Sequence, residues 1–169
     1  MKKIELIMPS LYQVKQSKLF AEFSLSTSID EYQKRGQADQ DKVMKDIYTG
    51  KIAEFMVFKW LKEKGKEATL PDLQIYKASQ KNFDADLTSG ETKIHVKSHV
   101  VNENYPVSWL FQKSDKLTTE PTDNDFLALV VLKKGGSYMY LEKAKDAVFK
   151  EPLKESLKES KVCIYEAKI

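Results

Sequence analysis

Apolar and polar positions alternate most regularly in the run NFDADLTSGETKIHVKSH, which spans residues 82–99. Strict alternation over two short segments separated by a glycine-containing turn predicts a β-hairpin with one face in a core and one face free for chemistry. The polar face of this hairpin carries five chemically active side chains, Asp84, Asp86, His95, Lys97 and His99.

The register of the hairpin depends on its turn. If Ser89 and Gly90 form a tight two-residue turn, counting outward sets Asp84 opposite His95, with Lys97 one pleat away. Both histidines of the chain lie in the second arm, so this strand is where the sequence concentrates its chemistry.

The clearest helical pattern runs from Thr49 to Gly65, with Thr49 or Gly50 at its start and Gly65 as the C-terminal cap. Its apolar positions are those of a core helix. Glu54 is the exception, an acid among residues that favour burial. By itself it could simply favour the positive end of the helix dipole. Next to the hairpin, it could also bring a carboxylate to the edge of a sheet where other acids gather.

The remaining pattern predicts further elements along the chain. Before the main helix we expect a short strand around Ile4 to Met8, a short helix from Gln13 to Phe23, and a helix from Ser28, as N-cap, to Tyr48, interrupted near Gly36. Beyond it we expect strands at Leu73–Tyr76, Val107–Gln112, Asp125–Leu132, Ser137–Leu141 and Val162–Tyr165, with helical turns at Glu142–Phe149 and Pro152–Ser160. The apolar run FLALVVL should be a central strand. This order predicts an α/β fold with a central mixed β-sheet flanked by helices, as a single domain over residues 1–169.

Composition restricts the possible classes of protein but does not indicate a function. A chain of 169 residues is long enough to fold as one domain, and its single cysteine, Cys163, excludes an internal disulfide. The formal net charge of +3 permits nucleic-acid binding through a local patch, but an ordinary solvated surface explains it equally well. The sequence has no apolar run long enough for a membrane span and no leader-like apolar core at its start, so we expect a cytoplasmic protein without a membrane partner.

Carboxylates that converge with an imidazole indicate a site for a divalent cation. A lysine on the same face is informative, because an ammonium beside a metal fits the orientation of an attacking water or the stabilisation of a charged phosphorane. Together they point to metal-assisted hydrolysis of phosphodiesters. The same residues are also what the solvated face of any hairpin would show.

Three segments resemble the PD-(D/E)XK nuclease superfamily, which has the restriction-endonuclease-like fold. They are the GKIAE run that ends at Glu54, the FD pair at Phe83-Asp84, and the I-x-V-K-S strand that contains Lys97. The resemblance covers roughly residues 28–115, with its core motifs in 50–115. It implies Mg²⁺ or Mn²⁺ as cofactor, DNA as partner, and Glu54, Asp84 and Lys97 as catalytic residues, with Asp86 competing for the aspartate position.

One position departs from that family pattern. The residue two before the lysine, normally Glu or Asp, is His95. Imidazole is still a metal ligand, better suited to Mn²⁺ or a later transition metal than to Mg²⁺. Glu91 could replace the missing acid, but we expect it to lie away from the catalytic end of the strand.

Substrate contacts are expected on either side of the lysine strand. Ser98 and His99 follow Lys97, and the SWLFQKSD segment should lie on the neighbouring strand, where Gln112 and Lys113 could contact phosphate. In the same segment, Trp109 fits a core better than a base-stacking surface.

The sequence therefore predicts a metal-dependent DNA endonuclease of the restriction or phage type, with Glu54, Asp84, His95 and Asp86 as metal ligands. Cutting both strands of a duplex would need a homodimer. An alternative is a catalytically impaired nuclease-fold module that binds nucleic acid or a protein partner. A third interpretation is a two-histidine, one-carboxylate metal site of His95, His99 and Asp84, against which the intervening Lys97 argues.

Overall fold

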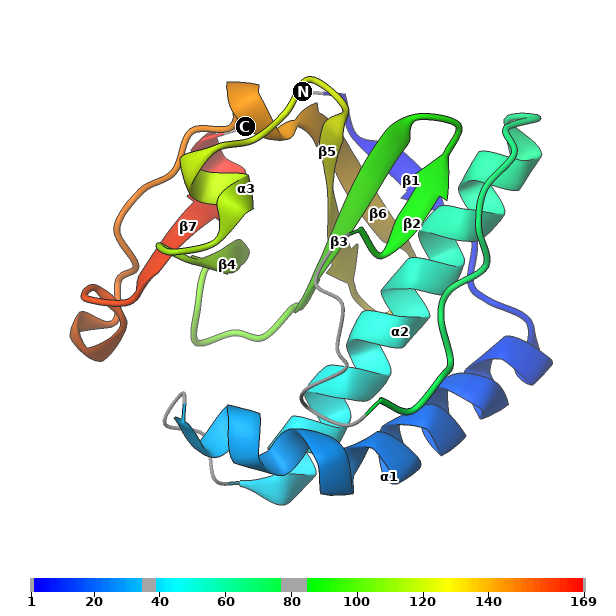
Figure 1. Ribbon diagram of the computed structural model, residues 1–169, viewed down its shortest axis with the longest axis horizontal. Helices are drawn as coiled ribbons and strands as arrows, with labels where there is room; N and C mark the ends of the chain where they lie inside the picture. The colour runs from blue at the N-terminus through cyan, green and yellow to red at the C-terminus, as the bar shows by residue number, and fades with distance from the viewer. Residues whose placement is uncertain (1, 35–38, 77–84, 169) are drawn as a thin grey trace.

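The computed structural model describes residues 2–34, 39–76 and 85–168 and contains a five-stranded mixed sheet with helices packed on it (Figure 1). The strand order is β1-β6-β5-β3-β2, in which β3 and β5 are parallel and the other neighbours are antiparallel. The strands are β1 Ile4–Leu6, β2 Leu87–Ser89, β3 Thr92–Val100, β5 Asp125–Leu132 and β6 Ser137–Lys143. The prediction of an α/β fold around a mixed sheet is confirmed.

Strand β5 is the middle of this sheet, as its apolar run FLALVVL predicts. Ala128, Val130 and Leu132 belong to the apolar cluster beneath α2. Leu127 and Leu129 point to a second cluster on the other face. Because both faces of β5 are covered, the strand has no polar side in its central part.

Helix α2, Gln40–Glu63, packs on one face of the sheet through Ile52, Ala53, Met56 and Val57. It begins earlier than the sequence pattern predicts, since the Asp39 side chain caps it by accepting a hydrogen bond from the Lys42 amide at 3.0 Å. The predicted start at Thr49 or Gly50 is therefore wrong, and both residues lie inside the helix. Gly65 follows the C-cap with a φ of +68°, the left-handed conformation expected after a helix end.

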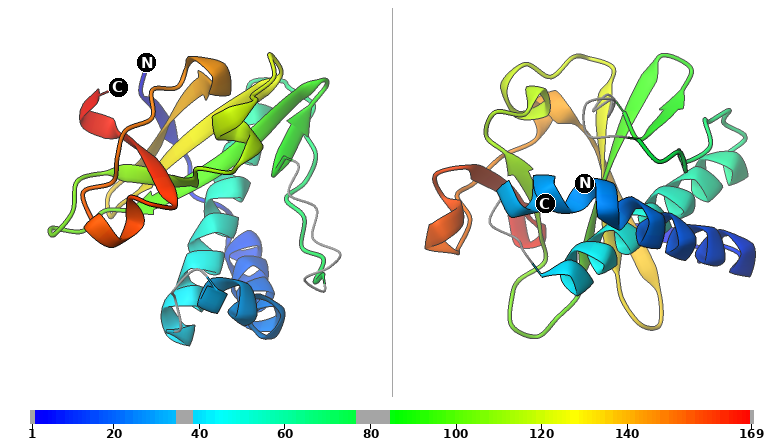
Figure 2. Two further views of the ribbon diagram at one scale, coloured as in Figure 1. Left: turned by 60° about the vertical axis from the view of Figure 1, so that its left-hand side comes forward. Right: turned by 60° about the horizontal axis from the view of Figure 1, so that its bottom comes forward.

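Helix α1, Leu11–Lys34, packs against α2 on the side away from the sheet (Figures 1 and 2). It is longer than the predicted helix from Gln13 to Phe23, and it runs through Ser28, so the prediction of an N-cap there is wrong. The strand predicted at Leu73–Tyr76 is also wrong, because this segment has no regular secondary structure.

The other face of the main sheet is covered by a small second sheet of β4, Ser108–Gln112, and β7, Lys161–Tyr165. A short helix α3, Lys116–Thr119, and 3-10 turns at Ala144–Asp146, Glu155–Leu157 and Glu166–Lys168 complete this layer. Trp109 and Phe111 are buried here, as the alternation in SWLFQ predicts. The expectation that this segment is a neighbouring strand of the main sheet is wrong, because β4 pairs with β7.

The β2–β3 hairpin forms, but its turn differs from the predicted one. Ser89 pairs with Thr92, so the turn residues are Gly90 and Glu91, and Gly90 has a φ of +59°. Leu87 consequently pairs with Ile94. One residue further out, this register places Asp86 opposite His95. The predicted pairing of His95 with Asp84 is therefore wrong.

Candidate functional site

Glu54 lies on α2 under the edge of the sheet and is only 9% exposed. Its neighbour one turn back, Lys51, is also buried and places its Nζ 2.6 Å from Glu54 Oε2. The same ammonium donates to the backbone carbonyl of Asp72 at 2.8 Å, and it lies 4.6 Å from the centre of the Phe20 ring. Sequence analysis missed Lys51, although its spacing of three residues from Glu54 is that of a helical ion pair.

The ionisation of Glu54 is strongly perturbed. Burial, together with the nearby Asp86 and Asp72 carboxylates, raises the pKa of Glu54 to about 7 against the opposing effect of Lys51. The negative charges of Asp86 and Asp72 disfavour the ionised form of the buried Glu54 carboxyl, so an added cation would stabilise its anionic form. The site therefore has the electrostatic character of a cation site, with one cation, the Lys51 ammonium, already beside it.

Asp86 connects this group to the lysine strand. It immediately precedes β2, its amide donates to the Ile94 carbonyl at 3.1 Å, and its Oδ2 accepts from the Val96 amide at 2.7 Å. Val96 directly precedes Lys97, so Asp86 is fixed beside the motif of the second arm. Of the two candidate aspartates, Asp86 is the one whose position near Glu54 can be described, since Asp84 lies outside the described residues.

His95 takes a different position from the one expected of a ligand beside Glu54. Ile94 and Val96 on either side of it pack toward α2, so the His95 side chain faces the opposite side of the sheet, where it is 7% exposed. Its Nε2 lies 3.1 Å from Asp125 Oδ1 at the start of β5.

Asp125 is in turn held by Thr122, whose amide and hydroxyl donate to Oδ2 at 2.8 and 2.6 Å. Burial acts to raise the pKa of Asp125, but the hydrogen bonds from Thr122 and His95 outweigh it and hold this pKa below its usual value. The residues that hold His95 in place, Asp125 and Thr122, carry no signal in the sequence pattern, because 30 residues separate the histidine from its partner.

Lys97, Ser98 and His99 line a groove of about 940 Å³ between the N-terminal half of α2, the C-terminal half of β3 and the start of β4. The Lys97 Nζ lies 5.5 Å from the centre of the Phe111 ring. His99 Nδ1 lies 2.9 Å from the Ser108 carbonyl oxygen. The strand that the sequence singled out thus contributes its last residues to an open polar groove.

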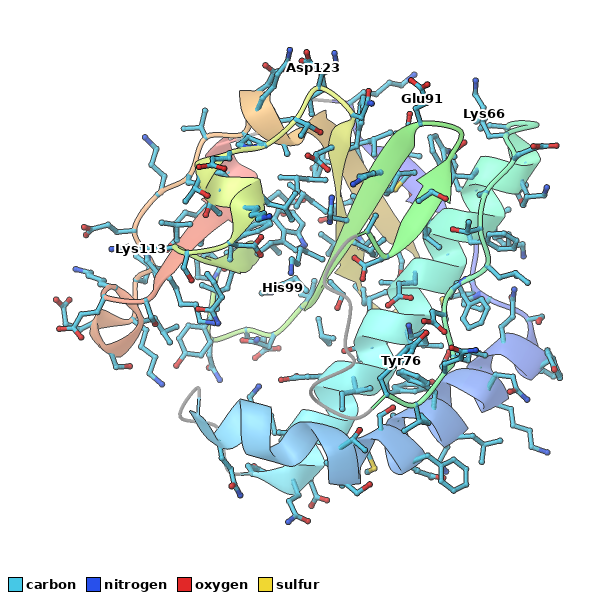
Figure 3. All side chains as sticks on the ribbon, viewed as in Figure 1. Lys66, Tyr76, Glu91, His99, Lys113 and Asp123 are labelled. Carbon is cyan, nitrogen blue, oxygen red and sulfur yellow. The ribbon has the colours of Figure 1, made fainter. Side chains whose placement is uncertain are left out.

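The other candidate substrate contacts, Gln112 and Lys113, are not among the residues that line this groove. They stand at the end of β4, where the Lys113 amide donates to the Ser160 carbonyl. Glu91 lies at the tip of the β2–β3 hairpin, at the opposite end of β3 from His99 (Figure 3). Its position agrees with the expectation that it is remote from the catalytic end of the strand.

Within the described ranges, no three His, Cys, Asp or Glu side chains lie close enough together to hold a metal ion. Mg²⁺ needs less than such a cluster, because it keeps several waters and binds through one or two carboxylates together with substrate phosphates. Glu54 and Asp86 meet that smaller requirement in charge and in chemistry.

Comparisons with protein-family models, with curated proteins and with solved structures found no match to this chain. Over the ranges that the structure describes, none of the helices has the length and apolar character needed to cross a membrane.

Proposed function

We propose that this protein is a metal-dependent nuclease of the restriction-endonuclease-like fold that hydrolyses phosphodiester bonds in DNA. The observation that carries the proposal is the buried Glu54, whose pKa is raised to about 7 by burial and by the negative charge of the nearby Asp86. Helix α2 carries this acid on the face of the mixed sheet, and the adjacent strand β3 contains the sequence V-K-S.

In this proposal Glu54 and Asp86 hold Mg²⁺ or Mn²⁺, and Asp84 remains a further candidate ligand. The bound ion would supply a water activated for attack and would offset charge on the phosphate. Lys97 lies two residues after His95 on β3 and therefore faces the same side of the sheet as His95, with its Nζ 5.5 Å from the centre of the Phe111 ring. In this proposal it supplies positive charge to a phosphate that approaches along the groove, and it does not orient the water on the Glu54 side. Lys51 keeps the Glu54 carboxylate in position through its 2.6 Å ion pair.

The test is incubation of the purified protein with supercoiled plasmid and either metal ion. Asp86→Asn should lower the cleavage rate by at least about 100-fold, because a lost ligand costs more than the tenfold to hundredfold of an outer-shell partner. Glu91→Gln removes the same charge from the hairpin tip and is the matched control, for which we expect an unchanged rate. Equal rates in both variants would contradict the proposal.

Cleavage should also depend on pH in a defined direction. A metal ion binds the ionised form of Glu54, whose pKa without metal is about 7, so the metal concentration needed for half the maximal rate should fall as the pH rises from 6 to 8. A half-saturating metal concentration that is the same at pH 6 and pH 8 would remove Glu54 from the metal site.

The second candidate is the catalytically impaired module that binds nucleic acid or a protein. The impaired module is favoured by His95, which takes the position of an acid in the superfamily pattern. The His95 side chain pairs with Asp125 on the face of the sheet opposite α2. No cleavage of duplex, single-stranded or branched DNA with either metal, combined with retained DNA binding in EDTA, would support this function over the first.

A further inference from the structure

Besides the groove, a hollow lies on the α2 side of the main sheet, outside the carboxyl ends of the parallel strands β3 and β5. Its volume is about 990 Å³, which is within the range of small-molecule sites. It is lined by Val100 and Leu132, the last residues of the two strands, and by Ser137 at the start of β6. The N-terminal half of α2 projects beyond the sheet beside it (Figure 2). In open α/β sheets, ligands bind in the crevice at this end of the strands.

The walls of this hollow are largely apolar. Helix α2 contributes Tyr48 and the buried Ile52, and the sheet contributes Val100, which is 40% exposed. Val101 and Met8 complete the apolar lining and are 43% and 55% exposed. Single exposed apolar side chains are normal on a protein surface, but here they gather around one concavity. This arrangement indicates a ligand with an apolar body.

One buried polar side chain in the lining has no partner. Ser137 is only 3% exposed, and it lies two residues before Met139, which packs beneath α2, so its side chain also points to the α2 side. Over residues 2–34, 39–76 and 85–168, the Ser137 hydroxyl forms no hydrogen bond. A buried polar group without a partner is costly, so a ligand that accepts a hydrogen bond from this hydroxyl would be favoured.

The rim of the hollow carries an excess of positive charge. Among its described lining residues, Lys133 and Lys134 stand against one acid, Glu103. The Lys133 Nζ lies 5.1 Å from the centre of the Tyr138 ring, which is on the other face of β6. Lys134 is exposed and, in the part of the chain that the structure describes, has neither an ion pair nor an aromatic contact. Lys134 is therefore the cation that a ligand can reach.

We propose that this hollow binds a small organic anion, with its apolar body against Ile52, Val100 and Val101 and its charged head on Lys134 and the Ser137 hydroxyl. An ammonium and a hydroxyl both donate hydrogen bonds, so together they match a head that only accepts, such as a carboxylate or a sulfonate. The inference does not depend on the proposed function, because none of these residues holds the metal or the phosphate there.

The probe is anilinonaphthalene sulfonate, an aromatic body with one negative charge. Its matched control is phenylnaphthylamine, the same body without the sulfonate. Fluorescence titration of the folded protein should show saturable binding of both, with the sulfonate binding more tightly. Because a charge-assisted hydrogen bond is lost, Lys134→Ala should weaken binding of the sulfonate at least about fivefold and change that of the neutral probe by less than a factor of about two.

Two further variants complete the titration. Ser137→Ala should weaken binding of the sulfonate about threefold, the effect of one neutral hydrogen bond. Lys66→Ala removes an exposed lysine beyond the C-terminal end of α2 (Figure 3) and should leave both affinities unchanged. A Lys134→Ala variant that binds the sulfonate as tightly as Lys66→Ala would overturn the inference.

Methionine methyl signals in NMR spectra locate the bound probe. Met8 lines the hollow, whereas Met44 of α2 is not among the lining residues. The sulfonate should shift the Met8 signal at saturation and leave the Met44 signal in place. An unmoved Met8 signal would reject the hollow as the binding site.

The same measurements separate other occupants of the hollow. Tight binding of the neutral probe without any advantage of the sulfonate would assign the hollow to an uncharged ligand and reject the anion. A dimer in sedimentation velocity that Val101→Asp converts to a monomer, combined with no saturable binding of either probe, would assign the hollow to a second copy of this chain.

Discussion

Glu54 holds its proton to higher pH than a glutamate in water, because burial disfavours the carboxylate more than Lys51 favours it. Below pH 4.5, its ordinary value, the side chain is protonated in the folded and the unfolded chain alike. Between 4.5 and about 7 the unfolded chain releases this proton and the folded chain retains it. This group therefore makes the protein less stable as the pH rises, until the full cost is reached above about 7.

The first stability prediction concerns this residue. The raised pKa corresponds to a cost of about 3 kcal/mol at most in the free energy of unfolding at pH 8. Glu54→Gln should remove this dependence, so that urea unfolding changes less between pH 5 and pH 8 than in the unaltered protein. Glu63→Gln, an exposed glutamate at the end of the same helix, is the control and should leave the dependence as it is. An identical pH dependence in both variants would show that Glu54 ionises normally.

At the scale of elements, Trp109 joins the small sheet to the main one. Its indole Nε1 donates to the backbone carbonyl of Val130 at 3.0 Å, and its ring meets Tyr140 edge-on with centroids 6.3 Å apart. The side chain is 1% exposed. This contact attaches β4 to the centre of β5, so it positions the wall of the groove that β4 provides.

Trp109→Phe should destabilise the protein by about 1 to 3 kcal/mol, because the indole hydrogen bond to the Val130 carbonyl is lost in a buried position and a small void replaces the larger ring. Leu110→Ala, the next residue on β4 and 43% exposed, should cost less than about 0.5 kcal/mol. Chemical denaturation of both variants measures the difference. Equal costs would show that the tryptophan hydrogen bond does not attach the two sheets.

At the scale of the whole molecule, Cys163 reports whether the small sheet opens separately. It is the single cysteine, lies on β7 and is 1% exposed, and burial raises the pKa of its thiol. Both accessibility and thiolate formation are therefore suppressed in the folded protein.

Labelling of Cys163 by a thiol reagent should be at least about 100-fold slower in native buffer than in denaturant, because reaction requires opening of the structure. Trp109→Phe should accelerate it by the same factor as it reduces stability if the two sheets open together. Rapid labelling of the unaltered protein, with its circular dichroism spectrum intact, would show that β4 and β7 detach on their own.

Local patterns in the sequence predicted much of the fold. Strand β5, the hairpin of β2 and β3, and the burial of Trp109 all follow from apolar periodicity, which depends on residues close together in the chain. The start of α2 was missed because the capping Asp39 precedes a polar first turn that lacks an apolar stripe. The hairpin register was missed because Ser89-Gly90 and Gly90-Glu91 are both plausible turns, and the packing of Leu87 with Ile94 under α2 selects the second.

For the candidate site, the sequence by itself determined the chemical types, namely an acid on a core helix, two acids in the first arm of the predicted hairpin, and a lysine between two histidines in the second arm. Only the tertiary structure decided which of them meet. It joins Glu54 to Lys51 and sets it within electrostatic reach of Asp86, turns His95 away to Asp125, and forms a groove from α2, β3 and β4. The physical reason is that side-chain alternation is a local property of a strand, whereas burial and pairing depend on elements that only the folded chain brings together.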